Sequence, residues 1–153
     1  MIGAFFKALH HWMALLGLAM KDDEPIEVRD PDRQWGPQTD GLMLSAKAKG
    51  QRLSVVIKNA GVKEIREKIP GWLFFYQLTI SGNPPCTNFG KQALDPKRAE
   101  RQTDLVLTPQ KAIEAEIPVD SLYALGRNSH RVTASCVIAG IKLVSNEVTI
   151  APQ

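Results

Sequence analysis

The stretch Arg-Val-Thr-Ala-Ser-Cys-Val-Ile-Ala-Gly-Ile-Lys-Leu-Val-Ser-Asn-Glu-Val-Thr-Ile, residues 131–150, decides the fold that we expect for this chain. In residues 131–138 one set of apolar residues occupies alternate positions: Val132, Ala134, Cys136 and Ile138. A period of two is the side-chain period of a half-buried β-strand. Ala139-Gly140 then predicts a tight turn, because glycine readily adopts the positive φ that hairpin turns need.

The second half of this stretch continues the pattern with one interruption. Ile141 and Leu143 face inward, and the apolar parity then switches to Val148 and Ile150. The switch predicts a bulge or bend near Ser145-Asn146. An isolated hairpin is marginally stable in water, so we expect the rest of the chain to supply strands that pack on this one.

Length and composition narrow the class of protein. The 153 residues suit one domain. A hydrophobic content of 44% and a charged content of 23% exclude a wholly disordered chain. Ten prolines and eleven glycines favour many short elements over a few long helices. The net charge of +3, with mixed signs, favours an ordinary solvated surface, so we expect no nucleic-acid partner.

Alternation appears again at the start of the domain. Residues 42–48 and 53–58 predict a hairpin around Gly50-Gln51, with one wet, lysine-bearing face. The charge-rich residues 62–69 predict an edge strand, because charged side chains discourage edge-to-edge pairing.

Shorter elements are expected further along the chain. Residues 105–107 and 113–117 predict two short strands. Residues 119–126 predict one helical turn, capped by Asp120 or Ser121 and stopped by a glycine.

Residues 72–80, Trp-Leu-Phe-Phe-Tyr-Gln-Leu-Thr-Ile, hold most of the aromatic mass and are expected to form the central strand of the core. An aromatic platform for nucleic acid or sugar is the alternative, and it is disfavoured because Leu and Ile are interleaved where such a platform has Arg and Lys. The predicted core residues are Phe74, Tyr76, Leu78, Leu53, Val55, Ile57, Val132, Ala134 and Cys136.

Residues 81–103 form the longest stretch without periodicity, and long loops in compact domains are often functional. We expect a recognition loop there, although an insertion without a role is the other interpretation. Its basic residues outnumber Asp95 and Glu100, which favours an acidic patch on a protein, or an anionic lipid headgroup, as partner. These candidate recognition residues are Lys91, Lys97, Arg98 and Arg101.

Residues 1–20 are apolar, and Lys7 is the only charged side chain in them. On a helix, one face would carry the candidate residues for docking to a membrane or a partner: Phe5, Phe6, Leu9, Trp12, Met13 and Leu16. The segment is long enough for a membrane anchor of roughly 28 Å, and it also suits a cleaved secretory signal or an interfacial helix. A helix packed on its own domain is the fourth interpretation.

The flanks of this segment predict its orientation. Lys7 precedes the apolar run and the acidic Asp22-Asp23-Glu24 follows it, which places the N-terminus in the cytoplasm and exports the domain. We therefore expect the cell envelope, at the periplasmic or extracellular face of a membrane, or secretion if residues 1–19 are cleaved. The proline-punctuated residues 21–38 predict a polar linker to a domain over residues 39–153.

Motifs of catalysis and metal binding do not occur in the sequence. A phosphate-binding loop, His-Glu-x-x-His, Gly-x-Ser-x-Gly and Cys-x-x-Cys are all missing, and two cysteines with three histidines are too few for a Cys/His metal site. We expect no enzyme, no metal and no cofactor. Cys86 and Cys136 predict either a disulfide, worth about 4 kcal/mol in an exported domain, or two free thiols.

Two segments carry a family resemblance. Residues 35–42, Trp-Gly-Pro-Gln-Thr-Asp-Gly-Leu, and residues 53–61, Leu-Ser-Val-Val-Ile-Lys-Asn-Ala-Gly, resemble the opening of exported bacterial immunoglobulin-like domains. Residues 145–150 resemble their ending, and the sandwich of the intracellular proteinase inhibitor family is similar. The resemblance implies an all-β, immunoglobulin-like antiparallel β-sandwich of seven or eight strands. His130 departs from it, because related domains often carry a tyrosine there.

Such domains are generally non-catalytic, so the resemblance implies binding or scaffolding and transfers no site residue. We expect an accessory or scaffold subunit, anchored or docked at a membrane complex through residues 1–20 and contacting a protein partner. The alternative is a soluble exported binding module that recognises its target through residues 81–103, and the similarity to the proteinase inhibitor family implies an inhibitor-like role for it.

Overall fold

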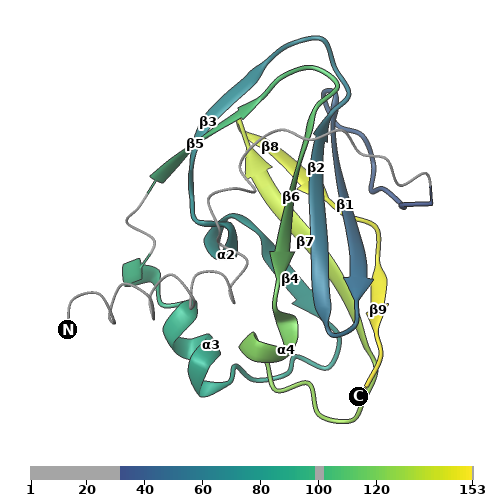
Figure 1. The fold of residues 1–153 in the computed structure, drawn as a ribbon, viewed down its shortest axis with the longest axis vertical. Coiled ribbons are helices and arrows are strands. Elements are labelled where there is room, and N and C mark those ends of the chain that lie inside the picture. The colour runs from purple at the N-terminus through teal and green to yellow at the C-terminus, as the bar shows by residue number, and fades with distance from the viewer. Residues whose placement is uncertain (1–31, 99–101, 153) are drawn as a thin grey trace, which may run out of the picture.

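The computed structural model describes residues 32–98 and 102–152, which form a mostly β structure with a few short helices. Within these residues nine strands form three antiparallel sheets (Figure 1). The expected leader, residues 1–20, and most of the expected linker lie outside the described residues.

The first sheet has the order β1-β2-β6. It consists of β1 (Leu42–Lys49), β2 (Arg52–Asn59) and β6 (Ala112–Ile117). Leu44 pairs with Ile57 in the first ladder, and Gly50 turns the chain with a φ of 61°. The predicted hairpin and the predicted strand over residues 113–117 are both confirmed.

The outer face of this sheet is drier than predicted. Ser45, Ser54 and Val56 were expected on a wet face, and all three are buried. The side chain of Arg33, only 5% exposed, reaches across this face and donates to Ser45 Oγ at 3.2 Å and Ser54 Oγ at 3.0 Å. The segment before β1 therefore covers part of the sheet, which the strand pattern alone does not reveal.

Glu114 completes the polar group under this cover. Its carboxylate accepts a hydrogen bond from Ser54 Oγ at 2.6 Å and lies 3.3 Å from Lys49 Nζ and 4.0 Å from Arg33. Burial alone would raise the pKa of this carboxyl, but the Ser54 hydrogen bond and the two cations outweigh it and lower the pKa below its ordinary value.

The second sheet contains the stretch that opened the sequence analysis. Its strands are β4 (Gln77–Ile80), β7 (His130–Ile138), β8 (Ile141–Val144) and β9 (Val148–Ile150), and β8 and β9 both pair with β7. The predicted turn is confirmed, since Ala139 and Gly140 have φ values of 50° and 77°. Positive φ at both central residues is the requirement of a type I′ turn.

The predicted interruption between β8 and β9 is also confirmed. The main-chain N–H of Ser145 donates to Ala134 O at 2.8 Å, and Ser145 Oγ accepts from the main-chain N–H of Ala134 at 2.9 Å. The Asn146 amide reaches β1, where it accepts from Ala46 N at 2.9 Å and donates to Ala46 O at 3.0 Å. The break in the ladder thus links the second sheet to the first.

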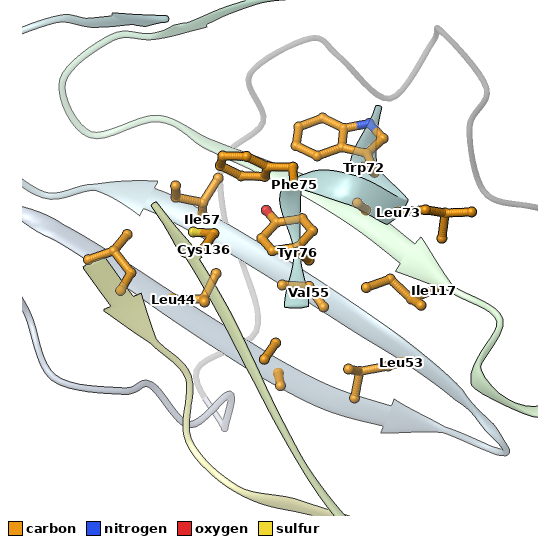
Figure 2. Packing of buried hydrophobic residues seen from close by; sticks show 14 of the residues in the cluster. Leu44, Leu53, Val55, Ile57, Trp72, Leu73, Phe75, Tyr76, Ile117 and Cys136 are labelled. Atoms are coloured by element: carbon orange, nitrogen blue, oxygen red, sulfur yellow. The ribbon is translucent and has the colours of Figure 1, made fainter. Parts of the chain in front are cut away.

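The aromatic stretch is not one strand, which corrects our prediction. Residues Trp72–Phe75 form the helical turn α2, and the strand β4 begins only at Gln77. The helical turn stacks Trp72 on Tyr76 with ring centroids 5.7 Å apart and places Phe75 4.8 Å from Tyr76 (Figure 2). Phe74, expected in the core, is only half-buried.

The core contains most of the residues predicted for it. Leu53, Val55, Ile57, Tyr76, Val132, Ala134 and Cys136 are buried, whereas Phe74 and Leu78 are half-buried. Figure 2 shows side chains of β1, β2 and β6 meeting those of α2 and Cys136 of β7. One apolar cluster therefore joins the first two sheets.

The third sheet pairs β3 (Ile65–Pro70) with β5 (Gln102–Leu107). The charge-rich strand predicted in residues 62–69 and the short strand predicted at residues 105–107 are both confirmed. The predicted loop over residues 81–103 is wrong in part, because it contains helix α3 (Asn88–Ala93) and the 3-10 turn η2 (Pro96–Arg98). The helical turn α4 (Val119–Leu122) is confirmed, but Pro118 occupies its N-cap and no side chain caps it.

Candidate recognition site at α3 and α4

The candidate site is built on α3, and Thr87 is the N-cap residue of this helix. Thr87 Oγ1 accepts a hydrogen bond from Gly90 N at 2.9 Å, which satisfies one of the free N–H groups at a helix start. The same hydroxyl contacts Ser121 O, and Thr87 N donates to Leu122 O at 3.0 Å. One residue therefore caps α3 and fastens it to α4.

Further main-chain contacts extend this attachment. Ala124 N donates to Pro85 O at 2.8 Å, and Cys86 forms a β-bridge with Tyr123. The segment entering α3 thus runs antiparallel to the segment leaving α4. Figure 1 shows the two helices next to one another at the end of β6.

Gly90 allows the two helical segments to approach closely. It is buried, and a Cβ built on it would lie only 2.0 Å from Leu122 O. No larger residue fits without moving the backbone of α4 or α3. We call the unit formed by residues 85–98 and 119–124 the α3–α4 platform, so that it includes the turn η2 after α3.

A cavity of about 260 Å³ lies beneath the platform. Its lining combines apolar side chains with one amide and two phenols: Leu73, Tyr76, Gln77, Leu78, Leu94, Ile117, Leu122 and Tyr123. For comparison, an apolar cavity of about 150 Å³ is enough to bind benzene. This cavity therefore has room for one large apolar side chain.

The rim of the cavity is made by partly accessible residues. Gln77 is exposed, and Leu78, Leu94 and Tyr123 are half-buried, whereas the remaining lining residues are buried. Partial burial raises the pKa of the Tyr123 hydroxyl, and the neighbouring Cys86 adds to this effect. The cavity thus opens past an amide and a neutral phenol, both able to hydrogen-bond an incoming peptide backbone.

Three of the four predicted basic residues are close in sequence to a residue that lines the cavity. Lys91, Lys97 and Arg98 are exposed and lie within four residues of Leu94, which lines the cavity. Asp95 fixes the turn between them by accepting from Lys97 N at 3.0 Å. Arg101, the fourth candidate, lies outside the described residues.

A second, more open hollow of about 550 Å³ adjoins the platform. It is lined by Arg52, Thr87, Phe89, Pro118, Asp120 and Ser121. Arg52 and Asp120 give this hollow both signs of charge, and Arg52 also pairs with Glu116 at 3.1 Å. Phe89 of α3 lines this hollow and Leu94, the C-cap of α3, lines the cavity, so the two lie at different parts of this helix.

The two cysteines are free thiols, so the disulfide considered above is not formed. Cys86 is half-buried beside Tyr123 on the platform, whereas Cys136 is buried in β7. Burial, with a smaller effect of Glu67, raises the pKa of the Cys136 thiol to about 12. A thiol with so high a pKa is a packed apolar group and a poor nucleophile.

The remaining sequence-based candidates fall outside the structure. The docking residues Phe5, Phe6, Leu9, Trp12, Met13 and Leu16 all precede residue 32, where the described chain begins. In residues 32–98 and 102–152 there is no helix long and apolar enough to span a bilayer. The same residues contain no group of three or more His, Cys, Asp or Glu side chains that could hold a metal ion.

Comparison with known proteins gives no match: no family model, no curated protein and no solved structure is significantly similar to the chain.

Sequence reasoning located the basic residues but missed the platform that carries them. The signal was present at Pro84-Pro85-Cys86-Thr87, where prolines precede a residue type common at N-caps. The cavity gave no such signal, because its lining comes from α2, β4, β6, α4 and the end of α3.

Proposed function

We propose that the protein is a non-catalytic accessory or scaffold subunit that binds a protein partner through the α3–α4 platform while residues 1–20 anchor or dock it at a membrane. The observation that carries the proposal is the combination of a helical platform fastened by hydrogen bonds, a cavity lined by leucines, an isoleucine and polar groups, and exposed cations within four residues of Leu94.

The partner chemistry follows from the charges and the cavity. Lys91, Lys97 and Arg98 complement an acidic segment, and the cavity accommodates one large apolar side chain of that segment. Binding energy in protein interfaces is concentrated in such buried anchor residues, whereas exposed charges mainly steer the encounter. The partner is thus an acidic protein segment with an apolar anchor.

The strand pairing supports an immunoglobulin-like scaffold for this site. Pairing of β2 with β6, β4 with β7, and β7 with β8 and β9 corresponds to the B–E, C–F and F–G pairs of that architecture. Domains of this kind commonly carry binding residues on the segments at the ends of their strands. The envelope localisation rests on the apolar residues 1–20 and the acidic residues that follow them.

The binding experiment uses two double variants of equal charge change. Lys97→Gln/Arg98→Gln should reduce partner recovery in affinity purification from solubilised membranes and should flatten its salt dependence. Lys63→Gln/Lys142→Gln, two exposed lysines outside the platform, is the control and should leave recovery unchanged. Equal recovery with both variants at low and high salt would remove the platform from the proposal.

A third variant tests the cavity separately from the charges. Leu94→Trp places a larger side chain at the cavity and should abolish binding with net charge unaltered. Circular dichroism of this variant checks that the β structure is retained.

The second candidate function is a soluble exported binding module of the inhibitor-like kind, and it is favoured by the location of the whole platform within the described residues. Mass spectrometry of the mature N-terminus, combined with cell fractionation, separates the two. An intact Met1 in the membrane fraction supports the anchored subunit, and a terminus near Met20 in a soluble envelope fraction supports the exported module. An intact Met1 in the cytosol contradicts both.

A further inference from the structure

His130, the first residue of β7, is buried with both ring nitrogens against main-chain carbonyl oxygens. Nδ1 lies 2.8 Å from Ser81 O, and Nε2 lies 2.7 Å from Leu125 O. A carbonyl oxygen only accepts hydrogen bonds, so each ring nitrogen must carry a proton for both contacts to be favourable. The geometry therefore fits the doubly protonated, positively charged imidazolium.

The two carbonyls belong to the two roots of the α3–α4 platform. Ser81 follows β4 directly and begins the segment that leads to α3, while Leu125 lies after α4. Ser81 is fixed to β7, since Ser81 N donates to Arg131 O at 2.9 Å and Arg131 N donates to Ser81 Oγ at 2.8 Å. One ring thus joins the strand that enters the platform to the segment that leaves it.

The further neighbours of the ring that the structure describes include a glycine and an isoleucine. Gly82 lies against one edge of the ring, and Ile150 of β9 pairs with His130 in the ladder. The neighbouring cations in the chain, Arg127 and Arg131, are exposed. The hydrogen bonds to Ser81 O and then Leu125 O raise the pKa of His130 above its ordinary value, and burial opposes them.

We propose that His130 is a pH-sensitive latch: the imidazolium holds the two roots of the platform together, and the loss of one ring proton releases one of them. In the neutral ring one nitrogen has a lone pair that faces a carbonyl oxygen, so that contact becomes repulsive. Ser81 is held independently by Arg131, so the root at Leu125 is the one that moves. The role of the latch in partner binding rests on the proposed function of the platform.

The sign of the pH dependence follows from the direction of the pKa shift. A group whose pKa is raised by folding stabilises the folded state below its unfolded pKa, which is about 6.5 for histidine. This stabilisation is lost as the pH rises through the folded pKa. The platform should therefore be latched below about pH 6.5 and loosened as the pH rises above the folded pKa of His130.

Nitrogen-15 NMR of the full chain tests the protonation state without any substitution. Both ring nitrogens of His130 should be protonated at pH values below about 6.5, and the titration midpoint should lie above that value. A midpoint at or below the ordinary value, or a neutral ring in mildly acidic solution, would overturn the latch.

Amide spectra over the same pH range test whether protonation reaches the platform. The N–H signals of Thr87, Gly90 and Ala124 should shift with the midpoint of His130, while that of Ala46 in β1 should not. His130→Gln, which keeps a hydrogen-bond donor but cannot titrate, should abolish these shifts. Shifts confined to Gly82 and Leu125 would show that the ring acts only locally, and would also overturn the proposal.

A binding measurement keeps this inference separate from the proposed function. Partner recovery by the full chain should fall at least several-fold when the pH is raised across the His130 midpoint, and His130→Gln should remove this dependence. Absence of binding at every pH would contradict the proposed function, and the NMR measurements would then decide on the latch. Binding that is independent of pH in the wild-type chain would contradict the latch.

Discussion

The terminal strands β7–β9 and the α2–β4 stretch are both rich in apolar residues, but only the first adopts the structure that its pattern predicts. In β7 a polar residue separates each inward residue from the next up to Ser135, so that only one strand orientation buries the apolar side chains. In residues 72–76 all five side chains are apolar or aromatic, and a strand and a helical turn both bury most of them. The polar positions, more than the apolar ones, therefore determine the local conformation.

The largest expected effect is in the α2–β4 stretch, where a substitution most directly tests the contrast between the strand β7 and the helical turn α2. Phe75→Ala should reduce the free energy of unfolding by about 3–5 kcal/mol, because it removes a buried ring that contacts Trp72 and Tyr76. Phe74→Ala should cost clearly less, since Phe74 is half-buried. Urea unfolding of both variants measures the difference.

The two phenylalanines are matched in size and adjacent in sequence, so each controls for the other. A continuous strand would place Phe74 in the core and Phe75 on the opposite face. A larger loss for Phe74→Ala than for Phe75→Ala would therefore restore the strand and remove the contrast with β7.

The platform offers a second test, because its sequence has neither type of periodicity. Gly90→Ala should cost about 3 kcal/mol, since the new methyl group would clash with Leu122 O and force the backbones of α3 and α4 apart. Gly71→Ala is the control, because a Cβ at Gly71 meets no atom within 4 Å, and it should cost about 1 kcal/mol or less. Thermal unfolding followed by circular dichroism compares the two. Equal losses would mean that the close approach of α3 and α4 contributes nothing to stability.

The smallest expected effect concerns the terminal strands and tests whether the break between β8 and β9 stabilises them. Ser145→Ala should cost about 1–2 kcal/mol, because the buried main-chain N–H of Ala134 loses its acceptor at the break between β8 and β9. Ser135→Ala, half-buried on the other face of β7, should change stability by less than about 0.5 kcal/mol. Hydrogen exchange at Ala134 N provides an independent readout. Unchanged protection there would show that the Ser145 hydroxyl is not needed.

The sequence was informative wherever a single segment determined its own environment. The β1–β2 hairpin, the turn at Ala139-Gly140 and the break at Ser145 all follow from alternation and turn chemistry. The cover over Ser45 and Ser54 does not, because Arg33 reaches them from a polar segment without any strand pattern. Ser45 in β1 and Ser54 in β2 would each be equally compatible with contact to water and with contact to a buried guanidinium.

The candidate site was predictable only at its surface. The excess of basic residues around Lys97 is visible in the sequence, whereas the cavity requires Leu73, Ile117 and Leu122 to converge from distant parts of the chain. His130 illustrates the same limit. The sequence shows only a lone histidine at the start of an alternating strand, whereas the contacts of its ring with Ser81 O and Leu125 O require the folded chain.

The attachments along the outer edge of β1 affect how copies of this protein behave in a crowded compartment. Thr39 exchanges two main-chain hydrogen bonds with Leu42, Gly36 N donates to Leu44 O at 2.8 Å, and the Asn146 amide occupies both main-chain groups of Ala46. An open strand edge invites another chain to add itself and begin aggregation. Here a turn, the segment before the strand and one amide side chain occupy the edge in succession, so a neighbouring copy finds little free main chain on which to grow a shared sheet.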